Sequence, residues 1–244
     1  MIDPRKILCL AKGGSHAYGL STPSSDIDLR GVFVNTKAEH LVGLKRDEVV
    51  TQQNAEKDNV MFEFRHALRL LRSANTQVIE LLYQERYEDI DPLWLEVKKV
   101  REKLIDSEKL FGCLRGYMQG ELRLANGERT GKLGGKRKTA IDTYGFSPKN
   151  FVQYFRLAWA GRIYFQKGYF PVNVFDESKT YGEFLLNIKV RPSSVSIDYL
   201  NDEAKKAEEF LVLDYESRKF NTQFDENVAN DLCVKVYKPL IASL

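Results

Sequence analysis

Apolar runs and helical periodicities divide the chain into two parts with different patterns. Apolar runs at residues 6–10 and 29–34 predict two buried strands, and the second run is rich in β-branched and aromatic residues. A third strand is expected at residues 59–62, and a helical spacing of apolar positions over residues 67–78 follows it directly. The Gly-, Ser- and Pro-rich segment between the first two strands has room for a short helix at residues 15–20. This first part is therefore predicted to form a mixed α+β layer.

The second part has an almost entirely helical pattern. One helix is well delimited, because Ser147 can cap it, Pro148 suits its first turn and Gly168 follows its end. A polar loop that contains glycine is expected at residues 128–138. Helical periodicity covers residues 93–104, 108–124, 148–166, 197–210 and 227 to the C-terminus. We therefore expect a small α+β domain at residues 1–90 and a mostly helical domain at residues 91–244.

Composition and charge exclude several classes of protein. The chain has 244 residues, of which 43% are hydrophobic, and its 37 basic and 34 acidic residues leave a net charge of +3. This small excess argues neither for nor against nucleic acid as a partner. The three cysteines lack metal-like spacing and suit free thiols in a reducing compartment. Because the N-terminus lacks a signal-peptide pattern and no apolar run approaches the roughly 20 residues that span a bilayer, we expect a cytoplasmic protein without a membrane partner.

Small residues and carboxylates between the first two predicted strands form the main candidate site. The segments are GGSHAYG at residues 13–19 and SSDIDLRG at residues 24–31. Side chains two apart on a strand point the same way, so Asp26 and Asp28 would share a pocket if they begin the second strand. Two such carboxylates can hold one magnesium ion and contribute to a second about 3.5 to 4 Å away. An Asp-x-Asp pair alone is more often a solvated turn or helix cap.

The residues before the carboxylates change that interpretation. Gly14 lets the backbone approach a bulky anion, and Ser15 offers a hydroxyl beside it. This arrangement would hold the phosphates of a nucleoside triphosphate next to the metal ions. His16 is weak evidence for a metal ligand, because no partner stands at ligand spacing.

The string GSHAYGLSTPSSDIDLRGVFV, residues 14–34, resembles a known signature. Its Gly-Ser, Tyr-Gly, Ser-Asp-x-Asp and Arg-Gly-Val/Ile-Phe elements are similar to those of nucleotidyltransferases related to the RNA repair pathway ligase-associated proteins, within the DNA polymerase β superfamily. Two positions depart from the family pattern: Thr76 stands where proline is common, and Gln153 where many members carry histidine. Further similar blocks lie at residues 63–71, 74–75, 80–82, 131–137, 144–146 with Lys149, and 156–157.

The resemblance implies a fold and an activity. The fold would be α+β, with a polymerase β-like mixed sheet followed by a mostly helical domain. The enzyme would transfer a nucleoside monophosphate from a nucleoside triphosphate such as ATP to an acceptor hydroxyl, with two magnesium ions, or manganese, as cofactors. Asp26 and Asp28 would hold the metal, whereas Gly14, Ser15 and Ser25 would bind the nucleotide.

The superfamily has a third metal-binding carboxylate on a neighbouring strand, for which two residues compete. Asp58 is slightly preferred, since it opens the third strand and shares a face with Val60 and Phe62. Glu63 matches the family's acidic position and is the alternative catalytic acid. Either residue could instead cap the helix that follows.

Basic residues of the second part are candidates for binding phosphate. Lys149 and Arg156 stand seven apart, on nearly one face of a helix, and the resemblance implies that such cations grip the triphosphate or nucleic acid. Tyr144 and Tyr154 are candidates for stacking on a base. A charge cluster is also commonly just a solvated face. The expected loop adds a cluster formed by Lys132, Lys136, Arg137 and Lys138.

The acceptor is less determined than the donor. RNA, at a tRNA or other 3′ end in RNA repair, is favoured by the resemblance and by the basic cluster. Protein nucleotidylylation (AMPylation) and modification of a small molecule stay open. A non-catalytic nucleotide sensor on the same fold is a different class of answer, against which the presence of both aspartates argues.

Overall fold

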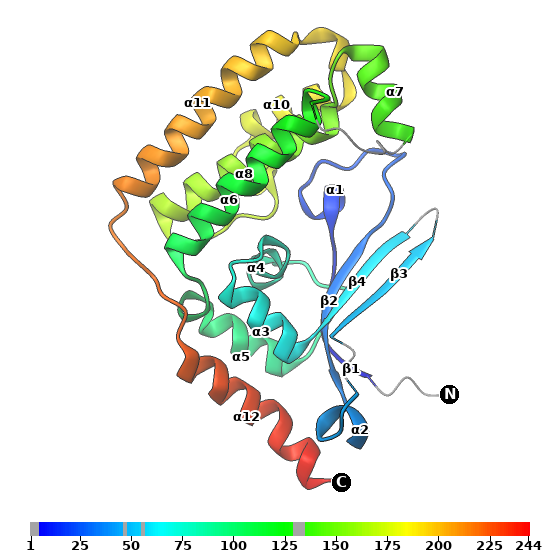
Figure 1. Ribbon diagram of the computed structural model, residues 1–244, viewed down its shortest axis with the longest axis vertical. Helices are drawn as coiled ribbons and strands as arrows, with labels where there is room; N and C mark the ends of the chain where they lie inside the picture. The colour runs from blue at the N-terminus through cyan, green and yellow to red at the C-terminus, as the bar shows by residue number, and fades with distance from the viewer. Residues whose placement is uncertain (1–4, 46–47, 55–56, 129–134) are drawn as a thin grey trace. The chain divides into compact units, whose positions relative to one another are not determined.

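The computed structural model describes residues 5–45, 48–54, 57–128 and 135–244. The described residues form a five-stranded sheet with helices and a mostly helical region, which confirms the predicted α+β class (Figure 1). Packing divides the chain into two compact units: Met1–Leu110 with Asn221–Leu244, and Phe111–Phe220. These units have other bounds than the domains expected at residues 1–90 and 91–244. Because the units describe packing alone, the expected domain limits stay a prediction.

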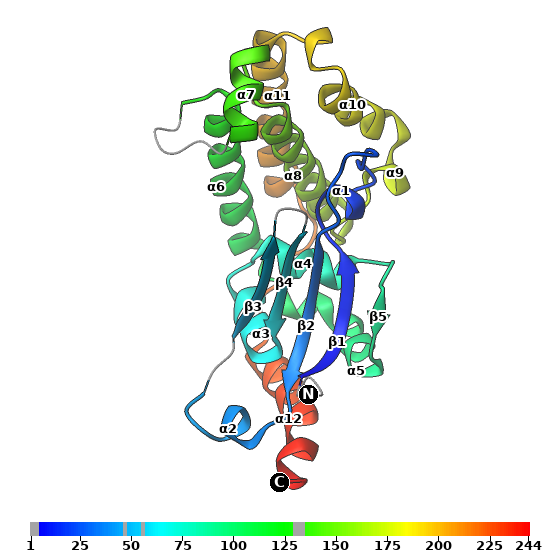
Figure 2. The same ribbon diagram turned by 90° about the vertical axis from the view of Figure 1, so that its right-hand side faces the viewer.

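The first unit contains the sheet, whose strand order is β3-β4-β2-β1-β5 (Figure 2). The pairing of β2 with β4 is parallel, whereas the other neighbouring strands pair antiparallel, so the sheet is mixed. The three predicted strands are present as β1, β2 and β4. The strands are β1 Arg5–Lys12, β2 Leu29–Asn35, β3 Val49–Asn54, β4 Lys57–Glu63 and β5 Asp89–Ile90.

Helices α3, α4 and α5 lie along one face of this sheet (Figures 1 and 2). In α3, Phe64, Ala67, Leu68 and Leu71 are buried at the spacing of one helical face. Asparagine or aspartate side chains cap the starts of α4, α5 and α12, as their helix-capping preferences predict. The helices of this unit are α1 Gly14–Ala17, α2 Ala38–Leu41, α3 Phe64–Arg72, α4 Thr76–Tyr83, α5 Pro92–Lys99, the 3-10 helix Arg101–Leu104 and α12 Glu226–Ala242.

The second unit is built around α8, Pro148–Lys167, most of whose side chains are buried. Its predicted limits are confirmed, because Ser147 occupies the N-cap position, Pro148 lies in the first turn, and Gly168 ends the helix with φ of 82°. Capping by the Ser147 side chain is wrong, since its hydroxyl donates to Asn150 Oδ1 at 2.6 Å and accepts from no described helix N–H. The other elements are α6 Ser107–Ala125, which begins in the first unit, α7 Gly135–Tyr144, α9 Val174–Glu177, α10 Lys179–Val190, the 3-10 helix Pro192–Ser194 and α11 Ile197–Glu216.

The loop expected at residues 128–138 is partly wrong. Residues 135–138 belong to α7, which continues as far as Tyr144, and the helix propensity of Lys136, Arg137 and Lys138 favours its first turn. Lys132 lies outside the described residues. Among the described residues, no helix is both long and apolar enough to cross a membrane.

Candidate functional site

Asp26 and Asp28 lie in the segment that leads into β2, just before the strand begins at Leu29. Asp26 is exposed and Asp28 is partly exposed. The backbone N–H of Gly13 donates a hydrogen bond of 2.8 Å to the carbonyl oxygen of Asp28, which ties the Gly-Gly-Ser turn to the carboxylate segment. Within the part of the chain that the structure describes, Asp28 forms no ion pair. Its carboxylate is therefore not neutralised by a described lysine or arginine.

Gly14 lies directly against the Asp28 carboxylate. A Cβ atom at position 14 would stand 2.8 Å from Oδ2 of Asp28, and the φ of Gly14 is +56°, in the left-handed region. Both observations require glycine here, the first because of space and the second because of backbone conformation. The backbone of the small-residue turn and the acid are thus adjacent, as the sequence pattern predicts for an anion site beside a metal site.

A compact turn precedes Asp26. The Ser25 hydroxyl accepts a hydrogen bond of 2.8 Å from the Thr22 N–H, and the Ser25 N–H donates one of 2.9 Å to the Thr22 carbonyl. His16 Nε2 lies 3.4 Å from the Ser25 carbonyl oxygen, which links α1 to this turn. These hydrogen bonds hold the backbone of the turn that directly precedes Asp26. Binding of the nucleotide by Ser25 stays a prediction. From the sequence, His16 was expected at most to cap or to contact phosphate, and its contact with Ser25 had no signal there.

Asp58 lies on the same face of the sheet as Arg30 and next to the start of β2. In the parallel register Arg30 is opposite Val60, so Arg30, Val60 and Asp58 share one face. Arg30 Nη2 is 3.1 Å from Asp58 Oδ2, and Nη1 donates to the Asp58 carbonyl. Asp28 lies two residues before Arg30, just outside the strand. The sequence motif contained Arg30, but its pairing with Asp58 had no signal in the sequence.

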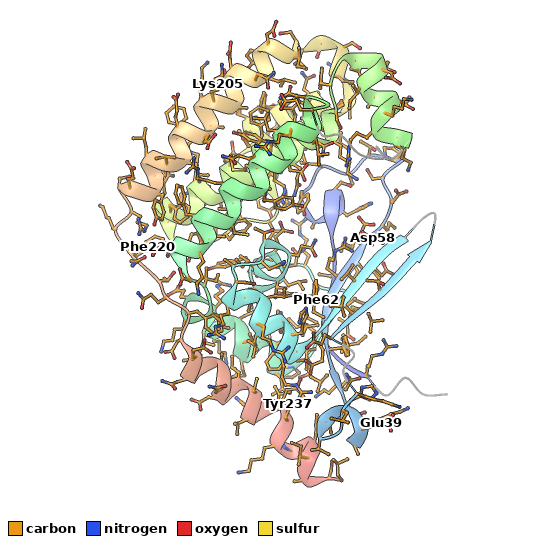
Figure 3. The ribbon with its side chains drawn as sticks, in the orientation of Figure 1. Glu39, Asp58, Phe62, Lys205, Phe220 and Tyr237 are labelled. Carbon is orange, nitrogen blue, oxygen red and sulfur yellow. The ribbon has the colours of Figure 1, made fainter. Side chains whose placement is uncertain are left out.

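Glu63 lies at the other end of β4, opposite Phe33 in β2. Its separation from Asp58 along the strand is about 16 Å, since a strand rises about 3.3 Å per residue. Figure 3 shows Asp58 and Phe62 towards opposite ends of β4, with Tyr237 of α12 near the Phe62 end. The structure therefore brings Asp58, but not Glu63, towards the end of the sheet where Asp28 lies.

The Glu63 side chain joins β4, α3 and α12. Only 4% of the residue is exposed, and its carboxylate accepts hydrogen bonds from the His66 N–H at 3.2 Å, from Arg65 Nε at 3.2 Å and from the Tyr237 hydroxyl. The Arg65 guanidinium lies 4.5 Å from the centre of the Tyr237 ring. Burial, together with the neighbouring Glu63 carboxylate, raises the pKa of Tyr237 well above its usual range. This arrangement indicates a structural role for Glu63.

Glu63→Ala is expected to lower the free energy of unfolding by about 3 kcal/mol, because a helix cap and a buried charge pair are lost together. Tyr237→Phe should cost about 2 kcal/mol, the loss of one hydrogen bond to a charged group. Urea unfolding measures both effects. A Glu63→Gln variant that unfolds like the wild type but has lost all transferase activity would assign Glu63 to the chemistry instead.

In the second unit, Lys149 and Arg156 differ in exposure. Lys149 is exposed, whereas Arg156 is 1% exposed and its Nε donates to Gln153 Oε1 at 3.1 Å. The buried Glu121 of α6 accepts a hydrogen bond of 2.6 Å from Asn150, which anchors the first turn of α8. Burial raises the pKa of Glu121, although three nearby cations, Arg137, Lys149 and Arg156, act in the opposite direction.

The two tyrosines considered for base stacking also differ. Tyr154 is 1% exposed and its hydroxyl donates to the Ala204 carbonyl at 2.8 Å, so its ring is part of the core. Tyr144, at the end of α7, is 40% exposed. Of the two, only Tyr144 offers an accessible ring face. The phosphate-binding roles of Lys149 and Arg156 stay predictions.

The donor set of the candidate site suits a hard cation. Among the described residues, no three or more His, Cys, Asp or Glu side chains are grouped closely enough to hold a metal ion by themselves. Magnesium in phosphoryl-transfer sites is commonly bound by one or two carboxylates, with water and substrate phosphates as the other ligands. Asp26 and Asp28, one exposed and one partly exposed beside the Gly14 turn, fit that pattern.

Comparison with known proteins agrees with this geometry. A family model described as the RNA repair pathway DNA polymerase beta family matches residues 3–176. The match includes the whole sheet, both aspartates of the candidate site, and α8 with Lys149 and Arg156. No curated protein matches the chain. Since the match covers well over half of the chain, and the resemblance in the motifs is confirmed, the chain belongs to the RNA repair pathway DNA polymerase beta family.

Proposed function

We propose that this chain is a magnesium-dependent nucleotidyltransferase that moves a nucleoside monophosphate from a nucleoside triphosphate to a hydroxyl group of RNA. The family supports a polymerase β-like nucleotidyltransferase of an RNA repair pathway. The single observation that carries the finer proposal is the contact of Gly14 with the Asp28 carboxylate. This observation supports the proposal, because transfer from a triphosphate requires space for anionic phosphates beside a carboxylate that can hold a cation.

Each residue of the site has a proposed task. Asp26 and Asp28 hold the metal ions, and manganese can replace magnesium there. The backbone at Gly14 and the Ser15 hydroxyl bind the β- and γ-phosphates. Bound magnesium supplies positive charge that activates the attacking hydroxyl and stabilises the leaving pyrophosphate. The protein contributes by positioning these charges rather than through a covalent intermediate.

The reaction is a displacement at the α-phosphorus. The acceptor oxygen forms a bond to that phosphorus, and the bond to the oxygen bridging to the β-phosphate breaks. The proton of the acceptor hydroxyl passes to solvent or to an acid of the site. Asp58 is the proposed third acid, because it lies near the start of β4 and beside the start of β2, whereas Glu63 lies at the far end of β4.

The role of Asp58 depends on the release of its carboxylate from Arg30. Asp58→Asn is expected to lower the transfer rate by about 10²-fold, a magnitude typical for the loss of one group that stabilises transition-state charge. Arg30→Gln should instead tighten binding of Mn²⁺, since the carboxylate loses a competing cation. Activity assays and Mn²⁺ titrations check the two effects. Wild-type activity in Asp58→Asn would remove Asp58 from the site.

The preference for RNA as the acceptor rests on α7. None of the residues of α7 is buried, and the helix carries Lys136, Arg137 and Lys138. A helix without buried side chains gains little from packing, so a polyanionic partner is a physical reason for its cationic composition. Lys149, in the first turn of α8 in the same unit, adds a further exposed cation.

A double substitution tests that surface. Lys138→Gln with Lys149→Gln is expected to weaken binding of single-stranded RNA and to lower the slope of log affinity against log salt by about 0.7 for each lost phosphate contact. Lys99→Gln with Lys109→Gln, which removes two exposed cations of α5 and α6, is the matched control. Equal salt slopes for wild type and the Lys138/Lys149 variant would contradict the assignment.

One assay tests the proposed function as a whole. The protein is incubated with each α-labelled nucleoside triphosphate, magnesium and a mixture of total RNA and protein. The proposal predicts label in RNA together with release of pyrophosphate. Label in protein would show nucleotidylylation (AMPylation) instead, and triphosphate binding without release of pyrophosphate would show a sensor.

A further inference from the structure

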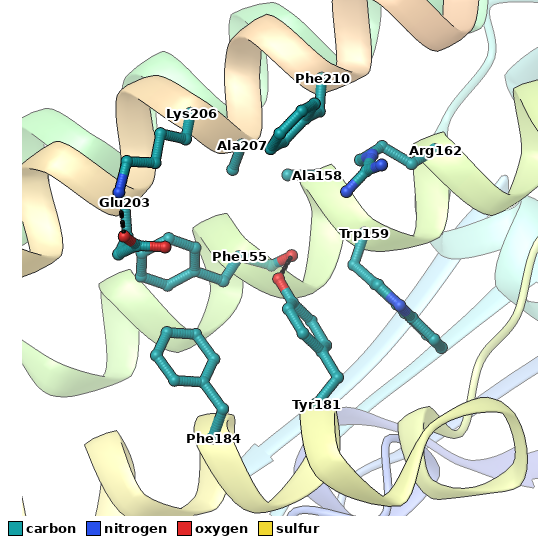
Figure 4. A pocket seen from close by; sticks show the side chains of 10 residues that line it. All are labelled: Phe155, Ala158, Trp159, Arg162, Tyr181, Phe184, Glu203, Lys206, Ala207 and Phe210. Atoms are coloured by element: carbon teal, nitrogen blue, oxygen red, sulfur yellow. Dashed lines mark hydrogen bonds and ion pairs between the residues drawn. The ribbon is translucent and has the colours of Figure 1, made fainter.

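A pocket in the second unit lies between three helices. Its volume is about 140 Å³. α8 forms the floor, with α10 and α11 as the two walls (Figure 4). α10 and α11 each pack on α8 but make few contacts with each other, which leaves the space between them open. Five aromatic side chains line it: Phe155, Trp159, Tyr181, Phe184 and Phe210.

The aromatic lining is held in place by its own contacts. The rings of Trp159 and Tyr181 stack with centres 5.5 Å apart, and the Tyr181 hydroxyl donates to the Phe155 carbonyl at 2.9 Å. Phe155 and Phe184 meet edge to face at 5.3 Å. Phe210, from α11, is 48% exposed at the opposite wall. An incoming ring would therefore meet preformed aromatic surfaces and little reorganisation would be needed.

Two alanines explain why the space is not filled. Ala158 of α8 and Ala207 of α11 line the pocket where larger side chains would occupy it. A dry cavity of about 150 Å³ accommodates one benzene ring. The pocket is thus of the size of a single small planar ring system rather than of a helix or an extended peptide.

Charged groups at the walls add polar recognition. The Arg162 guanidinium lies 4.7 Å from the Phe210 ring centre, and its Nε donates a hydrogen bond of 2.6 Å to Asp214 Oδ2. Lys206 and Glu203 of α11 form an ion pair of 2.7 Å. A carboxylate can accept a hydrogen bond from an exocyclic amino group, and guanidinium and ammonium groups can donate to a base carbonyl or a phosphate oxygen.

We propose that this pocket binds one unstacked base of a single-stranded nucleic acid. Flat aromatic walls, space for one ring system, and both a cation and a carboxylate at the lining together match a nucleobase on its sugar-phosphate chain. An aliphatic side chain of a partner protein would gain less than a flat ring from this aromatic lining. The proposal rests on the proposed function in one respect, since the nucleic acid would be the RNA that is modified at the carboxylate site.

Fluorescence of Trp159 provides a direct readout of the pocket. The chain has two tryptophans, so Trp94→Phe leaves Trp159 as the only one. The probes are a ten-nucleotide single-stranded RNA and an oligonucleotide of the same length with a sugar-phosphate backbone but no bases. Both are titrated with EDTA present and without triphosphate, so that binding is measured apart from transfer.

The proposal predicts quenching by the RNA and little or none by the abasic chain. Ala207→Leu, which fills the pocket, should weaken RNA affinity at least about fivefold, the low end expected for one base stacked on aromatic side chains. Thr180→Leu adds the same side chain at an exposed position of α10 and should leave affinity unchanged. If Trp94→Phe does not fold, the difference between wild type and Trp159→Phe gives the same signal.

The outcomes separate the pocket from the catalytic proposal. Equal quenching by both probes, or equal RNA affinity in Ala207→Leu and wild type, would overturn the base-binding pocket even if transfer to RNA continues. Base-dependent quenching that Ala207→Leu abolishes would support the pocket even if no RNA becomes labelled. In that case only the assignment of RNA as the acceptor would fail.

Discussion

Replacing Asp26 and Asp28 together by asparagine is expected to lower nucleotidyl transfer by at least about 10³-fold. The two carboxylates stand before β2, beside the Gly14 turn, and would supply the negative charge that holds the divalent cations. Asparagine keeps the shape and removes the charge. Because one residue is exposed and the other is partly exposed, the unfolding midpoint should change little. Release of pyrophosphate from labelled triphosphate measures the rate.

A second double substitution controls for the loss of two negative charges from the protein surface. Glu102→Gln with Glu108→Gln also removes two exposed carboxylates of the first unit, in the 3-10 helix before α6 and in the first turn of α6. This control should keep nearly wild-type activity. Transfer that persists in the Asp26/Asp28 variant at the rate of the control would exclude the mechanism.

The second large effect is expected for Gly14→Ala. The added methyl group would stand 2.8 Å from Asp28 Oδ2 at a φ of +56°, so either the carboxylate or the turn must move. We expect a loss of activity of about 10²-fold, because displacement of catalytic groups by about 1 Å has costs of that size. The free energy of unfolding should fall by about 1 kcal/mol, owing to the left-handed backbone.

Gly116→Ala is the control, because it adds the same methyl group at a position where no neighbouring atom stands in the way. Gly116 lies within α6, is exposed, and has no atom within 4 Å of the position that a Cβ would take. Alanine there should stabilise the protein by about 0.5 to 1 kcal/mol and leave activity unchanged. If Gly14→Ala retained full activity, the close approach of turn and carboxylate would have no catalytic meaning.

Much of the fold follows from local sequence signals. β1, β2 and the long helices were predictable because their apolar residues recur with the period of buried strands or of one helix face. The limits of α8 were predictable because Ser147, Pro148 and Gly168 each have a positional preference with a backbone cause. The nearness of Gly14 to the carboxylate segment was indicated by residue type, and in the structure a Cβ atom at position 14 would stand 2.8 Å from Asp28 Oδ2, whereas the roles of both residues stay predictions.

Other features depend on contacts between distant residues. β3 was not predicted, because beyond Val49 and Val50 its residues are polar and it lies at an edge of the sheet. Glu63 and Tyr237 meet although 174 residues separate them, and periodicity carries no information about such a contact. The same holds for the ion pair of Arg30 with Asp58. α7 was missed for another reason, since it buries no side chain and has no apolar face to detect.

Binding of Mn²⁺ in the presence of a triphosphate analogue that cannot be cleaved between its α- and β-phosphates tests the central claim most directly. Titration followed by electron paramagnetic resonance counts the bound ions without any turnover. We predict two ions in the wild-type protein with the analogue, and loss of both tight sites in the Asp26→Asn, Asp28→Asn variant. The same number of ions, bound with the same affinity, in both proteins would contradict the account.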